Sequence, residues 1–421
     1  MNKRNCTPVF KLFELAVLGA AMAVLISGCG RVDRSDQVVI WEQMDPVEQD
    51  LLEQHIAEFQ AAHPEYAHFT ITHVHYKPED VRTQYQTAAM AYGGPNLVYG
   101  PSDQTGPFSI MGLIQPIDEI FTDEELARFD PSGLPTLDGH VWGLPDQVGN
   151  HLTLVANLEW VDEIPVDTDA WLAQLRELTV DENGDGRPER YGLVFNMAEP
   201  FWLVPWLGGF GGWVMDDAGE PTLDSEAMAE ALAFLLGLKE SGVVPRECDY
   251  PLADTLFKEG NAAYVINGPW SWQGYREAGR EIRLAPLPRV SSTGLWPSPM
   301  TAAKCYSLNR YLDPAARACT IDLLRWLTGP EAQADLARAM GVLPADLEVR
   351  ERPELVADEL MAASRSQIDK GRLMPIVPEM RAIWDVMRPS YQSVLNGELS
   401  ADAAPGIMQA QALSAIAEMR E

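Results

Sequence analysis

The residues of this sequence best suited to chemistry are tryptophans that stand beside turn-forming residues. The chain has 12 tryptophans; Trp270 follows Gly268 and Pro269, and Trp384 follows Pro378. The face of an indole ring packs well against the C–H face of a sugar ring, while carboxylates and amides bind its hydroxyl groups. Any one tryptophan can equally be a core residue, but the position of Trp270 in a turn after a strand favours contact with a ligand.

Covalent catalysis has no comparable signature in the sequence. We find no nucleophile elbow, no glycine-rich phosphate loop, and no Ser/His/Asp or His/Cys pattern at a recognisable spacing. His73 and His75 fall on one face of a predicted strand, yet no cysteine or carboxylate accompanies them at the spacing that a zinc site requires. A secreted polysaccharide hydrolase is an alternative, for which a carboxylate pair such as Asp103 and Glu199 would have to flank the scissile bond.

A short acidic segment has the spacing of a calcium-binding loop. Residues with side-chain oxygens occupy loop positions 1, 3, 5 and 9, Gly186 allows the sharp turn at position 6, and Arg187 offers a backbone carbonyl at position 7. The four oxygen-bearing residues are Asp181, Asn183, Asp185 and Glu189. The glutamate expected at position 12 is absent, because Gly192 stands there. The segment is therefore either a structural calcium site or a simple turn before the strand at Tyr191.

The N-terminus has the layout of a secretory signal. Basic residues precede an apolar run from Leu15 to Ile26, and small residues then lead to Cys29. This run is too short for a membrane-spanning helix, which needs about 20 residues. The tail Ile26-Ser27-Gly28-Cys29 resembles a bacterial lipobox. We therefore predict a lipoprotein signal over residues 1–28, lipidation of Cys29, and a tether over residues 29–37 that keeps the protein outside the cytoplasm at a membrane surface.

Composition indicates a two-lobed, acidic protein. The chain has 421 residues, of which 46% are hydrophobic, and a formal net charge of −31. This length exceeds a single-core domain, and the negative charge excludes nucleic acid as a partner by repulsion. Beyond Cys6 and Cys29 there are three cysteines, too few for a disulfide framework. Either Cys305 and Cys319 form one bridge, or Cys305, Cys319 and Cys248 are three buried thiols.

Strands alternate with helices along most of the chain. Asp45 and Pro46 are predicted to begin the first helix as N-cap and first residue, and a later helix is expected over Ser225 to Lys239. This alternation predicts an α/β fold with largely parallel sheets. The predicted strands cover residues 38–41, 69–76, 97–99, 141–144, 152–156, 191–195, 262–266, 282–285 and 305–308.

Six segments of the chain resemble successive blocks of the extracellular solute-binding proteins of ABC importers, and most of all those that bind maltose or maltodextrin. The two most specific blocks are Phe257 to Gly260 running on to Ile266 to Trp270, and Met374 to Met380 followed by Trp384. The resemblance covers nearly all of the chain after the signal. The six segments are residues 38–45, 94–115, 138–158, 195–212, 257–272 and 371–388.

This resemblance implies two α/β lobes joined by a hinge, with the ligand bound in the cleft between them and enclosed as the lobes close. The first lobe would comprise residues 38–146 and 295–345, and the second residues 147–294 and 346–421.

The resemblance also implies a set of ligand-binding residues. Trp270 and Trp384 match the two sugar-stacking tryptophans of the family, Asp103 matches a hydroxyl-binding aspartate, and Arg388 matches a cleft arginine. Glu199-Pro200-Phe201 matches a Glu-Pro-aromatic ligand loop, with phenylalanine where maltose binders have tyrosine. The full set of candidates is Glu42, Asp45, Asp103, Gln104, Asn150, Glu199, Phe201, Trp270, Trp384 and Arg388.

Several positions depart from the maltose-binding pattern. Gln104 stands where maltose binders have an arginine, Gly100 replaces a cleft tryptophan, and Pro46 replaces a ligand lysine. The loop over residues 147–151, which contains Asn150, lacks the expected glutamate. Because glutamine and asparagine both donate and accept hydrogen bonds, these changes count against maltose itself and are compatible with another sugar.

We therefore expect a monomeric, lipid-anchored, extracytoplasmic solute-binding protein that captures a neutral carbohydrate, an oligosaccharide or a sugar glycoside, and delivers it to an ABC permease. No catalysis and no cofactor are expected, apart from the structural calcium that residues 181–189 would hold. The alternatives are a binder of another polyol or compatible-solute glycoside, a hydrolase, and a sensor lipoprotein that reports its ligand to a membrane receptor.

Overall fold

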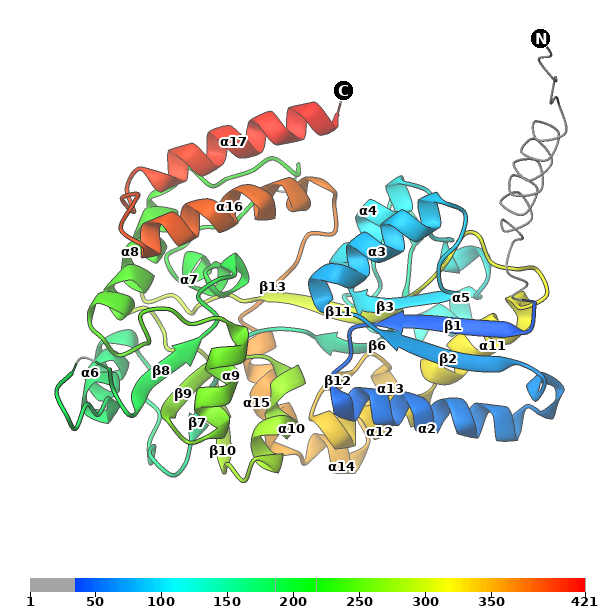
Figure 1. Cartoon of the computed structure of the whole chain (residues 1–421), viewed down its shortest axis with the longest axis horizontal. Helices are drawn as coiled ribbons and strands as arrows, with labels where there is room; N and C mark the ends of the chain where they lie inside the picture. The colour runs from blue at the N-terminus through cyan, green and yellow to red at the C-terminus, as the bar shows by residue number, and fades with distance from the viewer. Residues whose placement is uncertain (1–34, 186, 217, 421) are drawn as a thin grey trace, which may run out of the picture.

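The computed structural model describes residues 35–185, 187–216 and 218–420. Two lobes lie side by side, each built on a twisted sheet with helices packed on both faces (Figure 1). No helix in the described ranges is long and apolar enough to cross a bilayer. The predicted lipidation site, Cys29, lies outside the described residues.

The sheet of the first lobe is mixed. Strand β1 runs parallel to β2 and β3, while β11 runs antiparallel to β3 and β6. The strand order is β12-β6-β11-β3-β1-β2, and β13 pairs with the start of β11. The strands are β1 (Gln37–Glu42), β2 (Thr70–His75), β3 (Leu97–Pro101), β6 (Leu144–Gly149), β11 (Met300–Leu308), β12 (Leu343–Pro344) and β13 (Arg372–Leu373).

The sheet of the second lobe is mixed as well, in the order β10-β7-β9-β8. Only β8 and β9 are parallel, so the prediction of largely parallel sheets was wrong. The reason is that β7 and β11 are the first strands after a crossing between lobes, and they run away from the boundary while their neighbours run towards it. The strands are β7 (Thr153–Asn157), β8 (Tyr191–Phe195), β9 (Ala262–Asn267) and β10 (Ile282–Ala285).

The helices begin largely where local sequence predicts. Asp45 is the N-cap of α2 and donates its backbone N–H to Glu48 at 3.0 Å, and Ser225 caps α8. First-lobe helices are α2 (Pro46–Ala62), α3 (Pro78–Met90), α4 (Thr105–Ile110), α5 (Asp123–Ala127), α11 (Arg317–Leu327), α12 (Pro330–Met340), α13 (Leu347–Arg350) and α14 (Pro353–Val356). The others are α6 (Thr168–Leu178), α7 (Val204–Gly209), α8 (Glu226–Glu240), α9 (Tyr250–Lys258), α10 (Pro269–Glu277), α15 (Glu359–Ile368), α16 (Glu379–Leu395) and α17 (Ala404–Met419).

Shorter elements connect these helices and strands. The 3-10 turns are η1 (Pro64–Tyr66), η2 (Ser102–Gln104), η3 (Ile117–Glu119) and η4 (Pro200–Trp202), and a small hairpin pairs β4 (Thr136–Leu137) with β5 (His140–Val141).

Each lobe has a hydrophobic core of its own. Ile40, Tyr99 and Leu323 are buried in the first core, whereas Trp206 and Tyr264 are buried in the second. The C-terminal helices α16 and α17 pack beside α8 and so return to the second lobe (Figure 1). Three residues of the range 346–421, which the sequence assigned to the second lobe, pack in the first core instead: Val349, Leu355 and Met361.

The cysteines of the described chain are three buried free thiols, Cys248, Cys305 and Cys319. The bridge considered between Cys305 and Cys319 is therefore absent from the described residues, and the alternative of buried thiols is correct.

One crossing between the lobes passes directly from β6 to β7 through a strained turn. Gly149 has φ +116° and Asn150 has φ +26°, both in the left-handed region. The next residue, His151, is fully buried, with its ring edge-on to Trp272 at 6.2 Å and its Nε2 atom 3.4 Å from the Ser364 hydroxyl. Burial lowers the pKa of His151 from 6.5 to about 3, so this crossing holds a neutral imidazole.

The low pKa of His151 predicts a pH-dependent stability. The unfolded chain binds a proton at this residue near pH 6.5, but the native chain does so only near pH 3. The free energy of unfolding must therefore decrease as the pH is lowered through this window. Relative to His151→Gln, the parent should lose up to about 1.4 kcal/mol for each pH unit below 6.5. Urea unfolding of both proteins between pH 7 and 4 measures this difference; parallel curves would contradict a buried neutral histidine.

Candidate functional site

The predicted ligand residues follow strands whose carboxyl ends face the boundary between the lobes. Asp45 follows β1, Asp103 follows β3, Glu199 follows β8, and Trp270 follows β9. In open α/β sheets, ligands bind in the crevice outside the carboxyl ends of strands. The fold therefore gathers four widely separated segments of the chain at one place.

Asp103 is paired with an arginine of its own lobe. Arg82 on α3 donates from Nη2 to Asp103 Oδ2 at 3.0 Å, and the Asp103 side chain is 14% exposed. Burial raises the pKa of Asp103, while Arg82 and, from the other lobe, Arg381 of α16 oppose that rise. The influence of Arg381 shows that the two lobes approach each other here. Sequence reasoning missed Arg82 and Arg381, because nothing local marks their long-range partner.

Gly100 makes room for two glutamine amides. A Cβ atom at this position would lie 2.8 Å from Gln43 Nε2 and 3.1 Å from Gln104 Oε1. Gln104 is buried, and the buried Gln43 Oε1 atom has no hydrogen-bond partner. Where the resemblance led us to expect a tryptophan and an arginine, this chain thus presents a pair of amides.

Asp45 faces the second lobe. Burial raises its pKa to about 6; Lys304 opposes this rise, Glu48 adds to it, and residues of α9 contribute with both signs. Tyr250 at the start of α9 belongs to the same group, because burial and then the Asp45 charge raise its pKa. Trp270 acts on the Tyr250 hydroxyl as well and opposes this rise in its pKa. It is a candidate ligand residue that sequence reasoning did not find.

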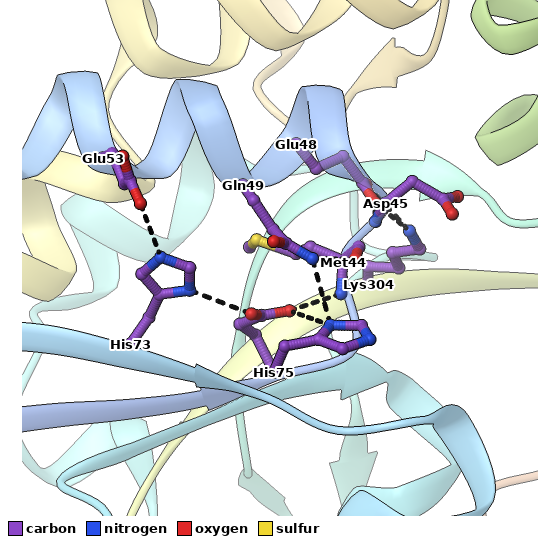
Figure 2. Close-up of polar contacts among 9 residues, drawn as sticks. Met44, Asp45, Glu48, Gln49, Glu53, His73, His75 and Lys304 are labelled. Atoms are coloured by element: carbon purple, nitrogen blue, oxygen red, sulfur yellow. Dashed lines mark hydrogen bonds and ion pairs between the residues drawn. The ribbon is translucent and has the colours of Figure 1, made fainter.

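Glu42 lies inside the first lobe. Its carboxylate contacts His73 Nδ1 at 2.9 Å and His75 Nδ1 at 3.2 Å, and accepts the Met44 N–H at 2.6 Å. Figure 2 shows both histidines of β2 turned towards α2, with Glu53 reaching His73 from that helix. Because these partners already engage both carboxylate oxygens of a fully buried side chain, we leave Glu42 out of the proposed ligand set.

In the second lobe, four of the predicted residues form two pairs. Arg388 donates to Glu199 Oε2 from Nη2 at 2.8 Å and from Nε at 3.1 Å. The rings of Phe201 and Trp384 lie 6.4 Å apart at 54°. Trp384 and Arg388 share one face of α16, so this helix presents an aromatic ring and a charged pair together.

Trp270 is seated on Gly268. A Cβ atom on Gly268 would lie 2.1 Å from the indole ring, so only glycine allows this ring position. Trp270 is half-buried against the second core, as are Phe201 and Trp384. Asn150, also half-buried, stands at the crossing between the lobes with its positive φ.

The acidic segment 181–189 forms a turn held by its own side chains. The side-chain Oδ1 atoms of Asp181, Asn183 and Asp185 accept backbone N–H groups of Gly184, Asp185 and Arg187, each at 2.8 Å. Glu189 accepts from Glu182 N and Asn183 Nδ2, also at 2.8 Å. Within the described ranges, no group of three histidine, cysteine or acidic side chains is placed to hold a metal ion. The turn explains these contacts, and calcium binding stays a prediction.

The calcium prediction has a direct test. If an ion binds this loop, added calcium should raise the melting temperature and a chelator should lower it, because a ligand that binds only the native state stabilises it. Asp185→Ala should abolish the effect. Asp216→Ala is the matched control, since Asp216 also accepts backbone N–H groups in an exposed turn. If neither calcium nor chelator changes the melting temperature, the calcium prediction is wrong and the segment is a simple turn.

The site combines half-buried aromatic rings with arginine–carboxylate pairs and amides. Such a set stacks on the apolar faces of a ring and satisfies many hydroxyl groups at once. Two α/β lobes with such a candidate site between them are typical of two-lobe ligand-binding proteins.

The chain belongs to the family of bacterial extracellular solute-binding proteins, whose model matches residues 54–363. It therefore acts outside the cytoplasm. It is 28% identical over 376 residues to the maltotriose-binding protein of Pyrococcus abyssi (strain GE5 / Orsay), covering 87% of this chain and 79% of that one. It is 21% identical to the galactooligosaccharide-binding protein of Bacillus subtilis (strain 168), covering 92% and 93% of the two chains.

Solved structures support the same assignment. The maltose/maltodextrin-binding domain MalE from Bdellovibrio bacteriovorus bound to maltotriose superposes with a TM-score of 0.87 at 37% identity, covering 91% of this chain and all of that one. The maltotriose-binding protein of Thermus thermophilus, at 21% identity and a TM-score of 0.82, shares the fold over 90% of this chain.

Proposed function

We propose that this protein captures a neutral oligosaccharide between its lobes and delivers it to an ABC permease. The observation that carries the proposal is the division of the site. The aromatic rings Trp270, Phe201 and Trp384 lie in the second lobe, whereas Asp103 lies in the first. A sugar that touches both lobes stabilises the closed arrangement by its differential contacts with the two states.

Maltotriose is the first ligand to test, because one relative and two solved structures carry it in their names. The amides of Gln43 and Gln104 at Gly100 are a reason to include other oligosaccharides, and the galactooligosaccharide-binding relative indicates which. A ligand without a hydroxyl for the buried Gln43 oxygen would leave that atom unsatisfied and would bind more weakly.

We further propose that the protein is a binder and not a hydrolase. A glycosidase needs one carboxyl group that is protonated and a second that attacks or activates water. Here Asp103 and Glu199 are each engaged in an ion pair with an arginine, at 3.0 and 2.8 Å, so neither carboxyl group is left as an isolated acid or nucleophile. Incubation with oligosaccharides and a search for cleavage products tests this proposal.

The stacking tryptophans provide the main test of the proposed function. We expect Trp270→Ala and Trp384→Ala each to weaken maltotriose binding by about 2–4 kcal/mol, which is roughly 30- to 1000-fold in Kd, because each removes an aromatic anchor. Calorimetric titration measures the loss. Trp326→Ala, a half-buried tryptophan of α11 in the first lobe, is the control. A well-folded double variant that binds the sugar as tightly as the parent would refute the site.

The lipid anchor is proposed from the sequence of the signal. The described chain enters β1 at Gln37, one residue inside the expected tether. Changing Cys29 to Ser should release the protein from membranes or leave the precursor uncleaved, because the thiol is the atom that would be lipidated. Fractionation and the mass of the mature N-terminus measure this. Normal processing with membrane retention of that variant would contradict lipidation.

We also propose that the protein is a monomer.

A further inference from the structure

Gly106 occupies the tightest glycine position of the described chain. It is the second residue of α4 in the first lobe. A Cβ atom built on it would lie 1.7 Å from the carbonyl oxygen of Ile376 and 2.8 Å from its carbonyl carbon, whereas real Cβ atoms essentially never come within 3.0 Å of a neighbour. Here the backbone of one segment lies directly against the backbone of another, which only glycine permits.

The partner segment belongs to the ligand-binding side of the second lobe. Ile376 lies between β13 and α16, in the stretch that leads into the helix of Trp384 and Arg388. Figure 1 shows this stretch descending from the start of α16 on the side that faces α3 and α4. Gly106 itself follows Asp103 by three residues. The contact therefore joins the two lobes beside the residues that would hold the sugar.

Local structure does not explain a glycine at this position. Gly106 has an ordinary negative φ, unlike the glycines of the chain that adopt left-handed turns. Inside a helix, glycine is less favourable than alanine by about 0.5–1 kcal/mol. Helix propensity would favour alanine at position 106, but the opposite lobe leaves no space for its methyl group.

We infer that Gly106 is the closure contact of this protein: the missing side chain lets the first lobe meet the Met374–Pro378 segment when the lobes close on a ligand. The inference rests on the proposed function. It gives Gly106 a positioning role, since the residue touches the opposite lobe and decides how near the two halves of the site can come.

Gly341, which also lies at the lobe boundary, does not share this role. A Cβ atom on Gly341 would lie 3.7 Å from Trp272, an ordinary van der Waals distance. Gly341 caps α12 with φ +72°, so its own conformation explains the glycine. Gly106 differs from Gly341 because its Cβ would meet a carbonyl group at 1.7 Å, and a carbonyl cannot rotate away as a flexible side chain can.

A methyl group at position 106 must hold the lobes apart. The closed state then becomes less populated, and the apparent affinity falls in proportion to the fraction of competent molecules. We expect Gly106→Ala to weaken maltotriose binding by about tenfold or more and Gly106→Val to weaken it further, because the larger side chain needs a wider gap.

The experiment combines calorimetric titration with small-angle scattering of the parent, Gly106→Ala and Gly106→Val. Gly237→Ala is the matched control: it adds the same methyl group inside helix α8, where no atom lies within 4 Å. The control should bind as the parent does. Ligand-free Gly106→Ala should melt close to the parent, which separates a closure defect from a folding defect. At saturating maltotriose the parent should contract and Gly106→Val should remain more open.

Equal affinity and equal radius of gyration for parent and both Gly106 variants would overturn the inference. If the parent binds no sugar of the panel, the proposed function fails and the scattering of the ligand-free proteins decides the inference alone. Because the substitution acts only on closed molecules, Gly106→Val should then remove the closed fraction of the ligand-free population and raise the mean radius above that of the parent; identical radii reject the closure contact.

Discussion

The structure depends on one constraint: each lobe must complete its own hydrophobic core, although the chain crosses between them more than once. The two cores are separate, and the residues at the boundary are half-buried aromatics, arginine–carboxylate pairs and amides. A boundary made of apolar core would bury so much surface that the lobes could not part. Keeping the cores apart leaves the facing surfaces available for a ligand.

The charged groups near the site are also paired within the protein itself, without a ligand. Beneath Asp45, Lys304 of β11 contacts Glu48 at 2.8 Å, and both side chains are almost fully buried (Figure 2). Close by, burial and the Glu48 charge raise the pKa of Asp146 to about 8. Pro46 stands where the resemblance led us to expect a ligand lysine, so this chain keeps a cation under the loop and not on its surface. A net charge of −31 is therefore compatible with a site that suits a neutral ligand.

Much of the fold follows from local pattern, because short apolar runs bounded by turn residues mark β1, β8 and β9 almost to the residue. Strand β6 was missed, and its residues 147–149 were expected in a loop. Its Pro145-Asp146-Gln147 run reads as polar, yet the lobe buries Asp146 and Gln147 in hydrogen bonds to Tyr99. The site shows the same division. Tryptophans beside prolines could be recognised one by one, whereas the contact between Glu199 and Arg388, 189 residues apart, is a property of the folded chain. Gly106 is the extreme case, because the contact that requires a glycine there is made by Ile376, far away in the sequence.

The return of α16 and α17 to the second lobe has a consequence for how the chain folds during its synthesis. The second core begins with Leu152 and includes Met408 and Ala412, close to the end of the chain. At about 5–20 residues per second, synthesis needs roughly 15 to 50 seconds to pass from the first of these residues to the last. Until then the second lobe lacks the helices that cover its core. A nascent chain therefore stays incompletely folded throughout translation, which is the state that a translocation channel can thread.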